Sequence, residues 1–114
     1  MSDCLFCRIV EKKIPAKVVY EDDQILAFDD VNPRAPVHTL VIPKQHVASV
    51  QDLGESDRTL LAQLLLACTK VAKHKGLADP GFRLVVNTGR DGGQTVFHLH
   101  FHVLGGRHMA WPPG

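Results

Sequence analysis

Residues 95–106 of the chain read TVFHLHFHVLGG. Three histidines, His98, His100 and His102, occupy every second position of an otherwise apolar run. Because side chains on a β-strand point alternately to opposite faces, the pattern predicts a strand over residues 96–104. One face would carry the imidazoles about 6.5–7 Å apart. The other face, with residues 97, 99, 101 and 103, would be wholly apolar and would pack on the core.

The remaining strands and helices follow from local patterns on either side. Four further strands are predicted at residues 18–21, 24–29, 37–43 and 81–87, from their β-branched and apolar residues and the turns that bound them. Apolar residues at helical spacing predict one long helix from Ser56, acting as N-cap, to Lys75. A short helical turn is expected at residues 4–10. Strands dominate, which predicts an α+β protein with a mostly antiparallel sheet of five strands.

Composition excludes several classes of protein. A chain of 114 residues with 45% hydrophobic residues suits one domain, spanning residues 1–114, with a real core. The net charge is only +1 and the basic residues are scattered, which argues against a nucleic-acid or anionic-membrane partner. There is no apolar run of about 20 residues and no signal-peptide pattern, so we expect a cytoplasmic protein. Three cysteines, an odd count, argue against a disulfide framework.

The histidine run has three interpretations. It can be a solvated sheet face, a three-histidine zinc site, or a site for nucleophilic and acid–base chemistry on a phosphate. The loop before the run favours the third interpretation. Gly92 and Gly93 allow backbone N–H groups to approach an anion closely, and Gln94 and Thr95 add hydrogen-bond donors.

The segment HLHFHVL matches the signature of the histidine-triad family, in which three histidines alternate with apolar residues. Residues 14–46, residues 91–107 and the ending WPPG resemble the histidine triad nucleotide-binding (Hint) branch of that family. The resemblance covers nearly the whole chain. It implies the histidine-triad fold, with two chains pairing through the long helix and the fourth strand into one continuous sheet. An unpaired fourth strand as apolar as LVV would promote aggregation, which independently favours a homodimer.

The resemblance also implies roles for the polar residues. His100 would be the nucleophile, because a neutral imidazole can attack phosphorus and form a nucleotidyl-histidine intermediate. Its other ring nitrogen needs an acceptor, which a backbone carbonyl on the same strand can provide. His102 would bind the α-phosphate or protonate the leaving group. His38 would join this hydrogen-bond network, and the Thr95 hydroxyl would bond to the leaving nitrogen or a phosphate oxygen.

A nucleotide site follows from the same resemblance. Asp30 would accept hydrogen bonds from the two ribose hydroxyls, and Asn87 would contact the phosphate–ribose region. Trp111 would reach toward the partner's active site. The base slot would be formed by Leu5, Phe6, Ile9, Phe28 and Val31. The phosphate end would be formed by Gly93, Gln94, Thr95, Val96, His100 and His102.

Cys4 and Cys7 form a C-x-x-C pair without the strand–motif–helix context of a redox site. A structural zinc needs two more ligands. The resemblance supplies them as His46 and His98, and the alternative is a pair of buried, reduced thiols. If zinc is bound, His98 is a ligand and cannot also transfer protons in catalysis.

We therefore expect a homodimeric hydrolase that cleaves the P–N bond of purine nucleoside phosphoramidates, with AMP or GMP as the nucleotide part. The chemistry would need no cofactor, and zinc would be structural. Three alternatives remain open: a dinucleoside polyphosphate hydrolase that also uses His100, a nucleotide-binding interaction protein with incidental hydrolysis, and a zinc-dependent adaptor.

Overall fold

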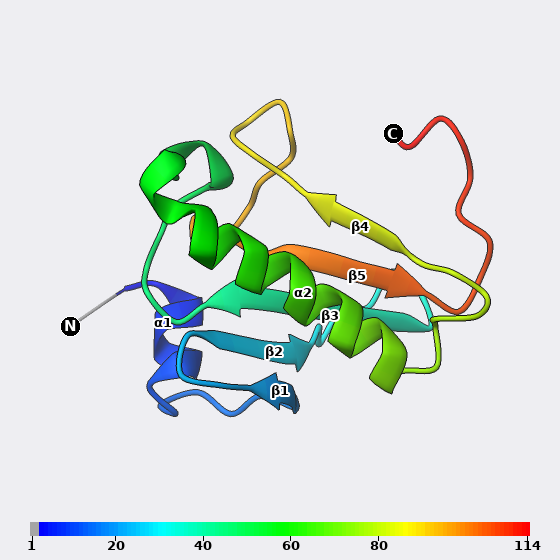
Figure 1. The fold of residues 1–114 in the computed structure, drawn as a ribbon, viewed down its shortest axis with the longest axis horizontal. Helices are drawn as coiled ribbons and strands as arrows, with labels where there is room; N and C mark the ends of the chain where they lie inside the picture. The colour runs from blue at the N-terminus through cyan, green and yellow to red at the C-terminus, as the bar shows by residue number, and fades with distance from the viewer. Residues whose placement is uncertain (1–2) are drawn as a thin grey trace.

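A five-stranded antiparallel sheet organises the molecule, whose structure, a computed structural model, describes residues 3–114 (Figure 1). The strands lie in the order β1-β2-β3-β5-β4, and every neighbouring pair is antiparallel. The elements in chain order are α1 (Leu5–Val10), β1 (Val18–Glu21), β2 (Ile25–Asp29), β3 (Val37–Pro43), α2 (Arg58–His74), β4 (Arg83–Val86) and β5 (Phe101–Gly105), with 3-10 turns at Val50–Asp52 and Glu55–Asp57. The predicted α+β fold with one long helix and a short N-terminal helix is confirmed. No helix within the described residues is long and apolar enough to cross a membrane.

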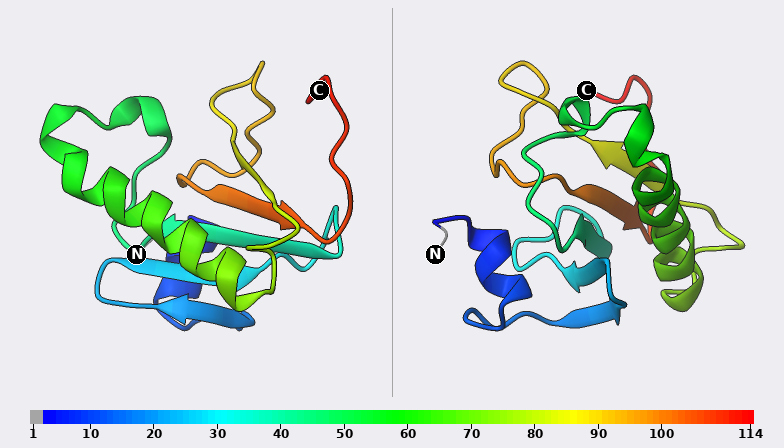
Figure 2. Two further views of the ribbon diagram at one scale, coloured as in Figure 1. Left: turned by 45° about the vertical axis from the view of Figure 1, so that its right-hand side comes forward. Right: turned by 60° about the vertical axis from the view of Figure 1, so that its left-hand side comes forward.

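The two helices cover opposite faces of the sheet, as the right-hand view of Figure 2 shows. Alternation along β3 feeds both cores: Val41 packs toward α2, whereas Leu40 and Ile42 pack toward α1. The α2 core also takes Leu64, Ala67, Cys68, Val71 and Ala72 from the helix and Leu99, Phe101 and Val103 from the histidine run. The α1 core is smaller and holds Phe6, Ile9, Leu26 and Phe28.

Helix α2 begins at Arg58 rather than at the predicted Ser56, so the predicted N-cap is wrong. Residues 55–57 instead form a 3-10 turn, in which the Gly54 N–H donates to the Asp57 carboxylate. The outward face of α2 carries two exposed leucines, Leu65 and Leu66.

The fifth strand begins at Phe101, five residues later than the predicted start at residue 96. In the ladder between β3 and β5, the last pair is Val41 with Phe101. Two positions further along β3 stands Pro43, which has no N–H to offer a partner strand. Residues 96–100 therefore leave the sheet, and Phe97, predicted to be core, is 59% exposed. Leu99 is buried as predicted.

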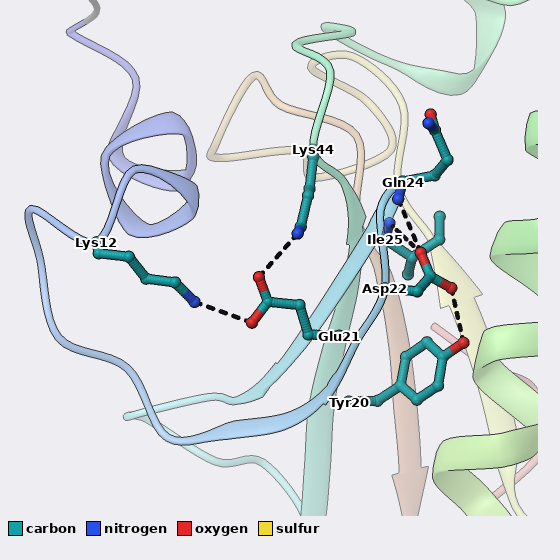
Figure 3. Close-up of polar contacts among 7 residues, drawn as sticks. All are labelled: Lys12, Tyr20, Glu21, Asp22, Gln24, Ile25 and Lys44. Atoms are coloured by element: carbon teal, nitrogen blue, oxygen red, sulfur yellow. Dashed lines mark hydrogen bonds and ion pairs between the residues drawn. The ribbon is translucent and has the colours of Figure 1, made fainter.

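The turn between β1 and β2 is closed by Asp22 (Figure 3). One Asp22 carboxylate oxygen accepts hydrogen bonds from the N–H groups of Gln24 and Ile25, and the other accepts from the Tyr20 hydroxyl. This local carboxylate–backbone pairing is typical of acidic turns. It fixes the hairpin whose second strand, β2, forms one wall of the site.

Glu21 ties the N-terminal helix to the end of β3 (Figure 3). Its carboxylate meets Lys12, just after α1, at 3.0 Å and Lys44, just after β3, at 2.8 Å. Hydrogen bonds from Lys44 and Lys12 lower the pKa of Glu21. The two chain segments that carry Cys4, Cys7 and His46 are thereby held on the same side of the sheet.

Candidate active site

A pocket of about 420 Å³ opens on the α1 face of the sheet. Its walls come from α1, β2, β3 and the histidine run. Most of the residues predicted to bind nucleotide or act in catalysis line it together: Leu5, Phe6, Ile9, Phe28, Asp30, Val31, His38, Thr95, Val96, His100 and His102. One end of this set is apolar, and the three imidazoles of His38, His100 and His102 stand at the other. The pocket can therefore hold a ligand with an apolar part and an anionic part.

The His100 ring is oriented by the backbone of its own segment. Its Nδ1 lies 2.7 Å from the carbonyl oxygen of His98. A carbonyl oxygen can only accept, so Nδ1 carries the hydrogen and Nε2 carries the lone pair. His100 lines the pocket, so a nucleophilic nitrogen is available to a ligand there.

His38 and His102 form a directed hydrogen-bond chain. The Arg34 backbone N–H donates to His38 Nδ1 at 3.0 Å, which leaves the His38 hydrogen on Nε2. That Nε2 lies 2.8 Å from His102 Nδ1 and donates to it. The His102 hydrogen is therefore on Nε2, a buried atom without a hydrogen-bond partner among the described residues. A buried donor without a partner in a pocket wall is a binding position for an acceptor such as a phosphoryl oxygen.

The pKa shifts of His38 and His102 agree with this hydrogen-bond chain. Burial, together with the neighbouring His100 and His38, lowers the pKa of His102 to about 4. Burial also lowers the pKa of His38, although the Asp30 carboxylate opposes the shift. Both rings are neutral at pH 7 in the free protein, as their single-hydrogen tautomers require.

Asp30, His38 and His102 also bring potential metal ligands close together. Their geometry argues against a metal. His38 Nε2 carries a hydrogen, and its 2.8 Å separation from His102 Nδ1 is a hydrogen-bond distance. Two nitrogens on a tetrahedral zinc would stand about 3.3 Å apart. Asp30 is instead held by the Asn32 N–H at 2.9 Å, with its other oxygen 3.5 Å from His38 Nε2.

A second cluster, formed by Cys4, Cys7, His46 and His98, fits zinc well. The His98 Nδ1 lies 3.4 Å from the Cys4 sulfur and 3.2 Å from His46 Nδ1, which itself lies 3.3 Å from the Cys7 sulfur. Four ligand atoms at zinc distances would be separated by about 3.3–3.8 Å. His98 Nε2 donates to the Pro43 carbonyl at 2.8 Å, so its lone pair on Nδ1 faces the cluster.

Comparison with known proteins identifies the family. The HIT domain family matches residues 11–109. The chain belongs to the HIT family. An uncharacterised HIT-like protein of Synechococcus elongatus is 54% identical over 113 residues, covering 99% of this chain and 98% of that protein.

Solved structures agree with this assignment. A HIT family hydrolase of Legionella pneumophila is 52% identical with a TM-score of 0.96, covering 98% of this chain and all of its own. A histidine triad protein of Clostridium difficile is 44% identical with a TM-score of 0.92, covering 96% of each chain.

Four residues of this HIT protein that were predicted to bind nucleotide lie outside the pocket lining, although all are among the described residues: Asn87, Gly93, Gln94 and Trp111. Trp111 is 80% exposed, with the Arg83 guanidinium 5.9 Å from its ring centre. Gln94 is buried and bonded to backbone groups. Nucleotide contacts by these four residues stay predictions.

The HIT pocket also has lining residues that sequence reasoning missed. Ile14, Pro15 and Ala16, in the loop between α1 and β1, complete its apolar end. Leu40 contributes from β3, and Arg34 from the loop before it. The loop residues carry no periodic signal, so the sequence pattern alone could not have identified them.

Proposed function

We propose that this HIT protein is a purine nucleoside phosphoramidase of the Hint branch, with His100 as its nucleophile. One observation carries the proposal. The His98 carbonyl fixes a lone pair on His100 Nε2, and the unpartnered donor of His102 stands on the neighbouring ring, with the ring centres 5.0 Å apart. A nucleophile beside a donor suits displacement at phosphorus. The hydrolase name of the Legionella pneumophila relative is consistent with it.

The first step forms the bond from His100 Nε2 to the α-phosphorus and breaks the P–N bond of the substrate. The leaving nitrogen must take up a proton. His102 is neutral in the free protein, so the site has to take up this proton when the substrate binds. A phosphate group beside His102 favours an additional proton on the His38–His102 pair, and Asp30 favours it from the other side. This proton passes to the departing amine.

The second step returns the site to the protonation state that it has with substrate bound, and the extra proton leaves the His38–His102 pair when the product dissociates. Water attacks the phosphorus of the nucleotidyl-histidine, the bond to His100 Nε2 breaks, and one water proton returns to the His38–His102 pair. The products are the nucleoside monophosphate and the amine. The apolar end of the pocket would take the base, and Asp30 would accept hydrogen bonds from the ribose hydroxyls.

The Cys4–Cys7–His46–His98 cluster would hold a structural zinc under this proposal. The metal would join α1 to the segments that follow β3 and precede β5. The phosphorus chemistry is assigned to His100, His102 and His38.

The test is turnover of adenosine 5′-phosphoramidate carrying a reporter amine. His100→Ala should lose about 10³-fold or more in kcat and retain AMP binding. His74→Ala, which removes an exposed histidine on α2, is the matched control and should keep wild-type turnover. An active His100→Ala would contradict the nucleophile assignment. A wild type that binds AMP without turnover would favour the nucleotide-binding interaction protein, and faster turnover of a dinucleoside polyphosphate would favour that hydrolase.

A further inference from the structure

Residues 95–100 carry two of the three histidines of the run and belong to no strand. Their position therefore does not come from a ladder of sheet hydrogen bonds. The Leu99 N–H donates to the Val47 carbonyl at 2.6 Å, which joins the segment to the chain just after β3. The His98 ring makes a second connection, because it donates to the Pro43 carbonyl at 2.8 Å. The side chain of Gln94 makes a third.

The Gln94 side chain bonds to the backbone of three separate segments. Its Nε2 donates to the Ala48 carbonyl at 2.7 Å and to the Val96 carbonyl at 3.0 Å. Its Oε1 accepts from the Gly89 N–H at 3.0 Å. The Gln94 backbone N–H donates back to the Gly89 carbonyl at 3.0 Å, so the pair closes the loop of residues 89–94.

These contacts use both amide hydrogens of a residue that is only 7% exposed. To contact a nucleotide, the amide would have to abandon backbone groups that it now satisfies. Each buried polar group that is left without a partner destabilises the protein. The observed arrangement therefore opposes direct ligand binding by this side chain.

We propose that Gln94 is a positioning residue that holds the catalytic segment against the chain after β3, and that it does not contact the nucleotide. This inference rests on the proposed function of the pocket. It replaces the sequence prediction that Gln94 lines the phosphate end.

The connection from Gln94 to the reacting atom is short. Thr95, which lines the pocket, stands between Gln94 and the Val96 carbonyl that Gln94 holds. Two residues later the His98 carbonyl orients His100. Loss of the Gln94 contacts lets this carbonyl shift, and a displacement of about 1 Å at a catalytic group can lower the rate about 10²-fold.

The experiment compares Gln94→Met with Gln51→Met, a matched substitution at an exposed glutamine in the 3-10 turn after β3. For Gln94→Met we expect kcat to fall about 10- to 100-fold, with the Kd for AMP within about 3-fold of wild type. Gln51→Met should change neither. A weakened AMP affinity with unchanged kcat would show that Gln94 is a ligand and overturn the proposal.

Hydrogen exchange gives a readout that does not depend on turnover. In Gln94→Met the Leu99 amide should exchange faster, whereas the Val103 amide within β5 should not. If wild type shows no turnover, the proposed function fails. The exchange of the Leu99 amide and the affinity for AMP then still show whether Gln94 positions the segment or binds the nucleotide. Unchanged Leu99 exchange in Gln94→Met would overturn the positioning role.

Gln94→Glu separates positioning from general destabilisation. A carboxylate offers no donor to the carbonyls of Ala48 and Val96, and their proximity raises the carboxyl pKa. Protonation restores one donor, so kcat relative to wild type should recover as the pH is lowered. A variant that is less stable in urea and has the wild-type pH profile would show a structural role only.

Discussion

His98 contacts the cysteine cluster through its ring and His100 through its backbone carbonyl. Its Nδ1 faces the cysteine cluster, while its carbonyl accepts the hydrogen of His100. Sequence alternation placed His98, His100 and His102 on one shared face. The structure keeps all three on the α1 side of the sheet, with the His100 and His102 ring centres 5.0 Å apart and Phe6 packed against both His98 and His100. His98 differs from the other two because its ring donates to the Pro43 carbonyl and faces the cysteine cluster. The family signature thus predicted which histidines form the site, whereas the different contacts of each ring depend on residues far away in sequence.

His102 makes stability depend on pH in a defined direction. Its pKa is about 4 in the folded protein and about 6.5 in the unfolded chain. Between these values the unfolded chain binds a proton that the folded protein does not. The free energy of unfolding therefore falls as the pH drops from about 6.5 to 4. Above pH 6.5 His102 is neutral in both states, so it no longer makes the free energy of unfolding depend on pH.

When the pH is lowered from 7 to 5, the free energy of unfolding should fall by about 1–2 kcal/mol less in His102→Gln than in wild type. Urea unfolding at the two pH values measures the difference. His74→Gln, at an exposed position on α2, serves as the control and should follow wild type. Equal losses in wild type and His102→Gln would mean that His102 is not held neutral by burial.

At the scale of elements, α1, the segment after β3 and the histidine run meet at the cysteine cluster. Purified protein should contain about one zinc per chain, and Cys7→Ser should lose it, because a hydroxyl is a poor substitute for a thiolate ligand. Metal content by mass spectrometry is the measurement. Cys68→Ala, which removes the cysteine buried in the α2 core, should keep the metal. Zinc retained by Cys7→Ser would place the metal elsewhere.

Local patterns predicted the existence of each element better than its ends. The alternation of β3 and the helical spacing of residues 58–74 depend on neighbouring residues alone, so the sequence shows them directly. The start of β5 depends on Pro43, which lies more than fifty residues earlier in the chain and ends the ladder that β5 joins. The neutral state of His102 likewise depends on burial, which alternation alone does not predict.

At the scale of the whole molecule, the exposed apolar side chains of α2 and β4 suit the expected dimer. Leu66 is 59% exposed and Leu65 47%, while Val86 stands at 36% on the edge strand β4. Burying such surface in a partner is favourable by about 25 cal/mol per Å². We expect wild type to sediment at twice the chain mass, and Leu66→Glu to sediment as a monomer.

The control for this dimer prediction is Val18→Glu. Val18 is 45% exposed on β1, the opposite edge of the sheet, so the same charge is added to a similarly exposed apolar position. It should leave the sedimentation unchanged. A Leu66→Glu variant that remains dimeric would contradict pairing through α2.

The two-sided role of β3 has an evolutionary consequence. A single inserted or deleted residue within Val37–Pro43 would send Val41 toward α1 and Leu40 toward α2, exchanging both cores at once. The same slip would move His38 to the wrong side of the sheet. Changes in length are therefore expected to survive selection in exposed connecting loops, such as residues 78–82 between α2 and β4, and to be eliminated in this strand.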